Sequence, residues 1–271
     1  MKFSVLLSVY RKEQPAYLRQ SLDSIFTQTL QPAEVVLVKD GPLTDALDEV
    51  AEEYCRKYPV LKVVPLSENQ GLGRALNEGL KYCSYDLVAR MDTDDVAKPE
   101  RFEKQIAVFC AHPEMDVVGA WIDEFEGSIE NVISVRVLPL EHSEIRRFAR
   151  KRNPVNHPVV MFRKSAVLVA GGYQHFPLFE DYYLWVRMLM NGARFYNIPE
   201  SLLYFRFSLD MFKRRGGWKY ALDEFRFQQF LFKSGFIGIL CFVQNVSVRC
   251  ISRIVPNGVR TVLYKKMLRK S

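Results

Sequence analysis

Residues 88–95 read Val-Ala-Arg-Met-Asp-Thr-Asp-Asp, so an apolar run ends in three carboxylates within four positions. Carboxylates this close repel one another, and they stay ionised together only where a cation or a set of donors compensates them. Loops between a strand and a helix also use Asp as a turn former or helix N-cap, and Asp95 fits that ordinary role. The stretch therefore predicts either a divalent metal site or a polar turn.

Strands and helices alternate on the N-terminal side of this stretch. Apolar runs that predict buried parallel strands are residues 3–10, 34–39, 61–66 and 85–91, and helical spacing is found over residues 17–29, 46–58 and 71–82. The repetition predicts an α/β fold, an open and mostly parallel Rossmann-like sheet with helices on both faces. Ligands of such folds bind beyond the carboxyl ends of the strands, where the three carboxylates fall.

Seven motifs along the first 206 residues share their order and spacing with one enzyme family. They are residues 3–10, 38–41, 69–77, 91–101, 156–158, 171–173 and 179–185. Together they resemble family 2 glycosyltransferases of the GT-A (nucleotide-diphospho-sugar transferase) fold. The resemblance implies a catalytic domain over residues 1–206 and leaves residues 207–271 as a separate basic, aromatic-rich helical region.

The resemblance implies a nucleotide-sugar donor, with a UDP-sugar favoured, and it assigns four residues to that donor. Asp40 matches the Asp that lies against uracil, although it is equally a turn residue before Gly41. Val9 and Tyr10 end the first strand beside the base, and a buried core tyrosine is the alternative for Tyr10. Arg74 lies in the first turn of a helix, where a cation and free N–H groups meet the donor, or it is simply solvated.

Asp92 and Asp94 match the DxD pair of the family, which implies a Mn²⁺ or Mg²⁺ ion between the donor phosphates. We expect Asp94 to bind the metal directly. Asp92 contacts either the same metal or the ribose.

Two further acids precede the apolar helical run 182–189, and the resemblance assigns them to the acceptor. Asp181 is expected to be the base that takes the proton of the attacking hydroxyl, and Glu180 is expected to orient the acceptor. Simple N-capping is the alternative for both residues. His157 follows the rigid loop 153–156, where a lone histidine touches the acceptor or phosphate, or is only a hydrogen-bonded structural residue.

The charge of the chain is concentrated near its C-terminus. Residues 205–271 hold 14 Lys and Arg against 3 Asp and Glu, although the whole chain carries 38 against 31. The apolar run 236–243 is too short to span a bilayer, and with its basic and aromatic neighbours it suits an anionic membrane surface. The alternative is a helix pair that packs on the catalytic domain. The sequence shows no recognised nucleic-acid-binding fold, so we expect no nucleic-acid partner.

Five widely spaced cysteines without a CxxC pair indicate a reducing compartment, and Met1 leads directly into the first strand without a signal peptide. We expect a cytoplasmic protein, peripheral on the inner face of the plasma membrane.

Residues 157–205 are also similar to bacterial enzymes of O-antigen, capsule or exopolysaccharide synthesis. The similarity implies an inverting transfer of galactose or glucose to N-acetylglucosamine on a polyprenyl diphosphate. A non-catalytic nucleotide-sugar-binding or scaffold subunit with the same fold is the second hypothesis. A nucleotidyltransferase is the third, and it is disfavoured because no glycine follows the first strand.

Overall fold

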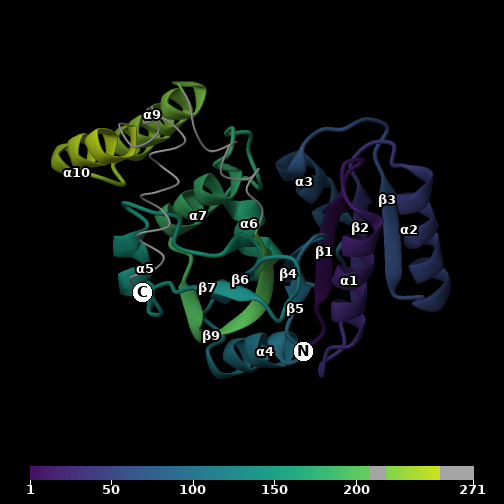
Figure 1. Ribbon diagram of the computed structural model, residues 1–271. Coiled ribbons are helices and arrows are strands. Elements are labelled where there is room, and N and C mark those ends of the chain that lie inside the picture. Colours follow the sequence, from purple (N-terminus) through teal and green to yellow (C-terminus); the bar gives the residue numbers. More distant parts are fainter. Residues whose placement is uncertain (208–217, 251–271) are drawn as a thin grey trace.

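The computed structural model describes residues 1–207 and 218–250, and strands within these ranges form one sheet (Figure 1). The strands are β1 (Ser4–Val9), β2 (Glu34–Lys39), β3 (Leu61–Pro65), β4 (Leu87–Asp92), β5 (Val96–Ala97), β6 (Val117–Phe125), β7 (Val132–Arg136), β8 (Met161–Arg163) and β9 (Phe195–Arg206). Their order across the sheet is β3-β2-β1-β4-β8-β6-β9-β5, and β7 pairs with β6. The parallel block β3-β2-β1-β4 confirms the sequence prediction, while β8 joins it in antiparallel orientation.

Helices cover both faces of this sheet. They are α1 (Pro15–Phe26), α2 (Asp45–Lys57), α3 (Leu72–Tyr82), α4 (Arg101–Ala111), α5 (His142–Phe148), α6 (Lys164–Val169), α7 (Glu180–Met190), α9 (Trp218–Lys233) and α10 (Ile239–Asn245), with a 3₁₀ turn η1 (His157–Val159) and a π turn η2 (Val246–Cys250). Along β1, Val5 and Leu7 face a core that α1, α2 and α4 cover, whereas Leu6 faces a second core under α3, α7 and α9. Burial on both faces explains why these strands read as continuous apolar runs.

The register of the parallel strands places the predicted site residues at one edge. Ser8 of β1 lies beside Asp92 of β4, and Val9 lies beside Lys39 of β2, so Asp40 follows at the same level. The carboxyl ends of β1, β2 and β4 therefore meet where ligands bind in open α/β sheets.

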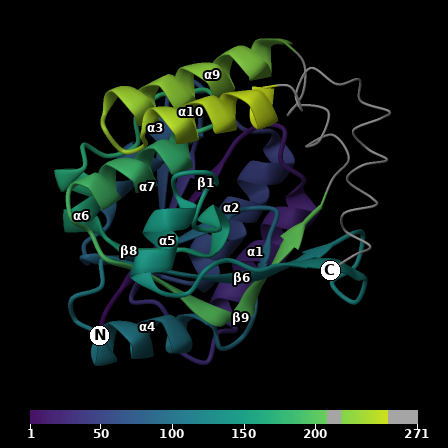
Figure 2. The same ribbon diagram turned by 90° about the vertical axis from the view of Figure 1, so that its left-hand side faces the viewer.

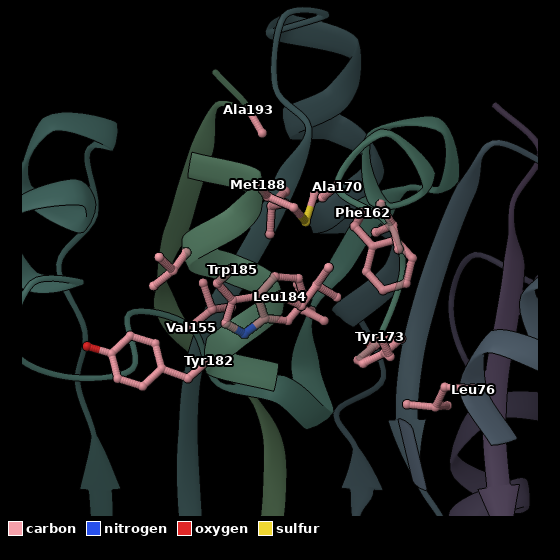
Figure 3. Packing of buried hydrophobic residues seen from close by; sticks show 14 of the residues in the cluster. Leu76, Val155, Phe162, Ala170, Tyr173, Tyr182, Leu184, Trp185, Met188 and Ala193 are labelled. Carbon is pink, nitrogen blue, oxygen red and sulfur yellow. The ribbon is translucent and has the colours of Figure 1, made fainter. Parts of the chain in front are cut away.

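The C-terminal helices α9 and α10 lie side by side above α7 (Figure 2). Phe227 of α9 is fully buried, with its ring centroid 5.1 Å from that of Phe179 and 4.6 Å from that of Tyr182. Figure 3 shows Tyr182 and Trp185 of α7 within the same core. Since α9 completes this core, truncation before α9 would expose it. The domain division at residue 206 stays a prediction.

None of the helices in the described ranges combines the length and the apolar character that crossing a bilayer requires.

Candidate functional site

The three carboxylates that follow β4 converge on one point. Asp92, Asp94 and Asp95 form an acidic turn, and one carboxylate oxygen from each lies within 4.8 Å of the others. Asp95 is fully buried, and its Oδ1 accepts a hydrogen bond of 2.8 Å from the backbone N–H of Arg206. Its Oδ2 is also buried and has no hydrogen-bond partner among the described residues. A buried carboxylate oxygen without a partner, within a group of three acids, fits a hard divalent cation.

The capping role expected for Asp95 is wrong. Helix α4 begins at Arg101 with Glu100 at its N-cap, so Asp95 lies too far upstream to cap it. The short strand β5 intervenes and pairs with β9, which brings Arg206 onto the acidic turn instead.

Charge repulsion in the acidic turn appears in the pKa values of its side chains. Burial, then the charges of Asp92 and Glu13, raise the pKa of Asp94 to about 7. Burial, then Asp94 and Asp92, raise the pKa of Asp95 well above its usual range. Without a cation, the turn therefore favours the protonated forms of Asp94 and Asp95, and a bound cation would favour their ionised forms.

Two fully buried arginines lie beneath the acidic turn. Arg90 donates a hydrogen bond to Oδ1 of Asp92 from two positions earlier on β4, because residues i and i+2 of a strand share a face. Arg101 donates one of 2.6 Å to the backbone oxygen of Arg90. Burial, then the charge of Arg90, lower the pKa of Arg101 to about 9. Arg90 therefore compensates part of the acidic charge from inside the protein.

Residues from a loop and from a distant strand also contact the acidic turn, and the sequence analysis did not identify them. The hydroxyl of Thr93 donates a 2.8 Å hydrogen bond to Glu13, in the loop after β1. The guanidinium of Arg206 donates one of 2.8 Å to the backbone oxygen of Asp94 and lies 3.8 Å from the ring centroid of Tyr17. Glu13 and Arg206 carry no distinctive local pattern, whereas Arg90 had one signal, an arginine within an apolar strand.

Asp40 follows β2 and is buried, and its carboxylate binds the loop before α3. Its carboxylate accepts hydrogen bonds from the backbone N–H groups of Gln70 (2.7 Å) and Gly71 (3.1 Å) and from the side-chain amide of Asn69 (3.0 Å). Asp40 thereby fixes the start of α3 next to the sheet edge. Its contact with a nucleobase stays a prediction.

The other residues assigned to the donor lie around this edge. Val9 is buried at the end of β1, while Tyr10 is 38% exposed and is not a core tyrosine. Arg74 is exposed in the first turn of α3.

Glu180 and Asp181 lie in the first turn of α7, and Phe179 occupies its N-cap. Oδ2 of Asp181 accepts a 2.6 Å hydrogen bond from the side chain of Asn153, and Oδ1 accepts one of 2.7 Å from the N–H of Tyr182. Burial, then the charge of Asp181, raise the pKa of Glu180. The Asp181 carboxylate is thus held in one orientation at the positive end of a helix dipole.

Tyr173 connects the two groups of acids. Its backbone N–H and oxygen form hydrogen bonds of 2.8 and 2.6 Å with the side chain of Asn77 on α3. Burial raises its pKa, the charge of Arg90 opposes that rise, and the charges of Asp181 and Asp92 add to it. Tyr173 therefore lies within electrostatic range of Asp92 in the acidic turn and of Asp181 in the first turn of α7.

His157 packs against this tyrosine. Its Nε2 lies 2.9 Å from the hydroxyl of Tyr173, and its ring also contacts Trp185. Burial, then the charge of Arg90, lower the pKa of His157 well below its usual value. A neutral, hydrogen-bonded histidine supports the structural role rather than contact with phosphate.

Comparison with known sequences gives one matching family and close relatives. The model of "Glycosyl transferase family 2" matches residues 4–169. The amylovoran biosynthesis glycosyltransferase AmsE of Erwinia amylovora is 44% identical over 268 residues, which are 97% of this chain and 98% of AmsE. A UDP-Gal:alpha-D-GlcNAc-diphosphoundecaprenol beta-1,3-galactosyltransferase of Escherichia coli is 37% identical over 269 residues, 99% of this chain and 97% of that enzyme.

Solved structures share the fold at low sequence identity. Residues 1–349 of Staphylococcus aureus TarS, in complex with UDP-GlcNAc, match with a TM-score of 0.64 and 20% identity, over 84% of this chain and 66% of that one. The mannosyltransferase PcManGT of Pyrobaculum calidifontis, in complex with GDP-Man and Mn²⁺, matches with a TM-score of 0.61 and 18% identity, over 91% and 68% of the two chains. These matches establish the GT-A fold.

Proposed function

The chain belongs to glycosyltransferase family 2, and from this premise we propose that it is an inverting, metal-dependent hexosyltransferase that uses a UDP-sugar. Relatives over nearly its full length act in the synthesis of bacterial surface polysaccharides, which supports glycosyl transfer of that kind. One observation carries the proposal. The three acids of the turn converge within 4.8 Å and include the unpartnered Oδ2 of Asp95, and the charges of Asp92 in this turn and of Asp181 both act on Tyr173.

The acidic turn is the proposed place of a Mn²⁺ or Mg²⁺ ion. Asp94 is the proposed direct ligand, and Asp92 holds either the ion or the ribose. Asp95 is added to this set because one of its carboxylate oxygens lies within 4.8 Å of those of the other two acids, and its buried Oδ2 has no hydrogen-bond partner among the described residues. A bound divalent ion would offset the charge of the departing diphosphate as a Lewis acid.

The donor is proposed to lie along the carboxyl edge of β1, β2 and β4. Val9 and Tyr10 would flank the base, and Asp40 would meet it from the loop that it fixes. Arg74 would approach the diphosphate from the first turn of α3, where the helix dipole also favours an anion.

Asp181 is the proposed base. The acceptor hydroxyl oxygen forms the new bond to the anomeric carbon, the bond from that carbon to the UDP oxygen breaks, and the hydroxyl proton passes to Asp181. Attack from the face opposite the leaving group inverts the anomeric centre. Asn153 keeps the carboxylate in position for this step, and Glu180 orients the acceptor.

The proposed acceptor is N-acetylglucosamine on a polyprenyl diphosphate, and the proposed sugar is galactose or glucose. Support comes from the Escherichia coli relative, whose name contains a diphosphoundecaprenol-linked acceptor. A lipid-linked acceptor would place the enzyme in the cytoplasm, peripheral on the anionic inner face of the plasma membrane. The positive charge of residues 205–271 supports this location.

A donor panel tests the proposal directly. Purified protein is incubated with UDP- and GDP-sugars, Mn²⁺ and a lipid-diphosphate N-acetylglucosamine acceptor; product mass identifies the sugar, and NMR of the new linkage reports inversion. A retained anomeric configuration, or full activity in EDTA, would overturn the mechanism. Donor binding without transfer or donor hydrolysis would instead favour the non-catalytic scaffold.

A further inference from the structure

Helix α10 and the turn η2 direct two polar side chains, Asn245 and Arg249, inward. Asn245 is 4% exposed and donates hydrogen bonds to the backbone oxygen of Arg150 (2.8 Å) and to the side chain of Gln228 on α9 (2.9 Å). Four residues further on, Arg249 pairs with the fully buried Glu224 at 2.7 Å. One face of α10 and η2 is therefore polar and buried against α9 and the segment after α5.

The opposite face is exposed and mostly apolar, with Gln244 and Ser247 as its exposed polar residues. Leu240 is 85% exposed, Val243 is 53% exposed and Val248 is 65% exposed, and Ile239 lies next to them at 56%. A helix on a water-facing surface normally has the reverse arrangement, with its apolar stripe turned inward. Single exposed apolar residues are common, but a contiguous stripe of them marks an interaction surface.

Aromatic side chains extend this surface onto α9, which runs beside α10 (Figure 2). The ring of Phe242 lies 5.3 Å from that of Phe232 and 6.1 Å from that of Phe225, and Phe232 is 39% exposed. The exposed surface thus spans both helices.

Basic residues adjoin the same surface. Arg147 is exposed in the last turn of α5, and the segment after it contains exposed Arg150, Lys151 and Arg152. The backbone of this segment is bonded directly to α10 and η2 through the oxygens of residues 150 and 151. An apolar surface with cations at its edge matches the chemistry of an anionic lipid bilayer, where burial of apolar side chains and attraction to phosphate add.

We propose that this docking face, formed by Phe232, Ile239, Leu240, Val243 and Val248 with the basic residues 147 and 150–152, rests on an anionic bilayer. The inference builds on the proposed lipid-linked acceptor. Arg152 precedes Asn153, whose side chain bonds to Asp181, so the bilayer contact lies next to the residue that positions the proposed base. A lipid-anchored sugar would then be presented close to Asp181.

Vesicle co-sedimentation tests the docking face with the full-length chain. Phosphatidylcholine vesicles with and without phosphatidylglycerol are compared, and wild type should sediment with the anionic vesicles, less so at high salt. The double variant Leu240→Glu/Val243→Glu should lower the partition coefficient on the order of tenfold or more. Arg150→Gln/Lys151→Gln should lower it by about fivefold per lost cation.

Matched controls come from the end of α2, which lies on the far side of the sheet (Figure 1). Val60→Glu also places an acid at an exposed apolar residue, and Arg56→Gln also removes an exposed cation. Both should bind vesicles as wild type does. Transfer to a short soluble acceptor should stay near wild type in all four variants, which shows that the catalytic part is folded.

Three results would overturn the docking face. Wild type does not bind anionic vesicles, or the acidic variant binds them as wild type does. In the third, ultracentrifugation shows that wild type is a dimer and that the acidic variant is a monomer. The last result would make the face an interface between copies. Vesicle binding without transfer to any acceptor would overturn the proposed function and leave the docking face standing.

Discussion

The buried guanidinium of Arg90 donates a hydrogen bond to the carboxylate of Asp92, two residues further along β4. A buried positive charge is thereby bonded to the acidic turn at the carboxyl edge of the sheet. Arg90 lies in the core layer, whereas the Asp92 side chain is 29% exposed. Because Arg90 and Asp92 both belong to β4, a change at Arg90 should affect both the stability of the fold and the charge of the site.

We therefore expect Arg90→Met to lower the free energy of unfolding by about 1–3 kcal/mol, because it leaves the half-buried Asp92 without its charge-paired hydrogen bond. Urea denaturation followed by circular dichroism measures this loss. Arg56→Ala, which removes an exposed arginine paired with Glu52, should change it by less than about 0.5 kcal/mol. Equal effects of the two substitutions would show that Arg90 is not electrostatically important.

The acidic turn should make the protein more stable with Mn²⁺ than without it. At a metal concentration about 100 times the dissociation constant, the gain is about 2.7 kcal/mol, measured as a rise in Tm. Asp94→Asn replaces a buried carboxyl group, whose pKa is raised to about 7, with a neutral amide, so above pH 7 it should raise the Tm of the metal-free protein, and it should abolish the Mn²⁺ effect. Asp94→Ala should also abolish transfer. An Asp45→Asn control on exposed α2 should leave the Mn²⁺ effect intact, and an unchanged Mn²⁺ response in Asp94→Asn would contradict the site.

Asp181→Asn keeps the shape of the proposed base but not its basicity. Turnover should fall by about two to four orders of magnitude, while donor affinity measured by calorimetry stays near wild type. Asn153→Ala frees the carboxylate to rotate, so it should reduce turnover by roughly tenfold, with the remaining activity still dependent on Asp181. Near-normal turnover of Asp181→Asn would leave Asp181 as an ordinary acid of the first helical turn.

Glu34 gives the stability a defined pH dependence. Burial alone would raise its pKa, but hydrogen bonds from Lys62, Ser4 and Ser84 outweigh burial and lower the pKa from 4.5 to about 2. The folded state therefore holds this proton less tightly than the unfolded state, so the stabilisation is complete above pH 4.5 and is lost as the pH falls toward 2. It amounts to about 3 kcal/mol.

Urea titrations between pH 6 and pH 2, chosen to bracket that window, should show a smaller acid-induced loss in Glu34→Gln than in wild type. Glu49→Gln, at an exposed position of α2, serves as the control and should follow wild type. Parallel curves for wild type and Glu34→Gln would contradict the assignment.

Two glycines with positive φ allow the cost of backbone strain to be measured apart from the cost of a steric clash. At Gly172 (φ +65°) an added Cβ would lie 2.7 Å from Oδ1 of Asn77, whereas at Gly71 (φ +85°) it would meet nothing within 4 Å. Gly71→Ala should cost about 1 kcal/mol of stability through φ alone. Gly172→Ala should cost more and also impair transfer, because Asn77 holds Tyr173. Thermal unfolding compares the two, and equal losses would rule out the contact.

The parallel half of the sheet could be predicted because its strands are buried on both faces and read as apolar runs. Residues 34–39 and 61–65, for instance, are strands within one residue of the predicted bounds. The second half could not, because β5 and β8 have only two and three residues and pair with strands far along the chain. Pairing of β5 with β9, which removes Asp95 from its expected capping role, is such a case.

The proposed site residues were found where a local pattern marks them, as in the acidic turn and at the start of α7. Partners that act across the sheet were missed. Glu13 meets Thr93 across 80 positions and Asn153 meets Asp181 across 28, and neither contact has a sequence period that would indicate it. Such contacts follow from tertiary packing alone.

The contact between Arg206 and the acidic turn has a consequence for the order in which the protein is made. All three acids of the turn belong to the first 95 residues. Arg206, however, donates the hydrogen bonds to Asp95, from its backbone N–H, and to the backbone oxygen of Asp94, from its guanidinium. A chain emerging from the ribosome thus carries the acids long before it can arrange them. We expect the proposed divalent-ion site to assemble only once residue 206 has been synthesised, so that an incomplete chain cannot bind the ion prematurely.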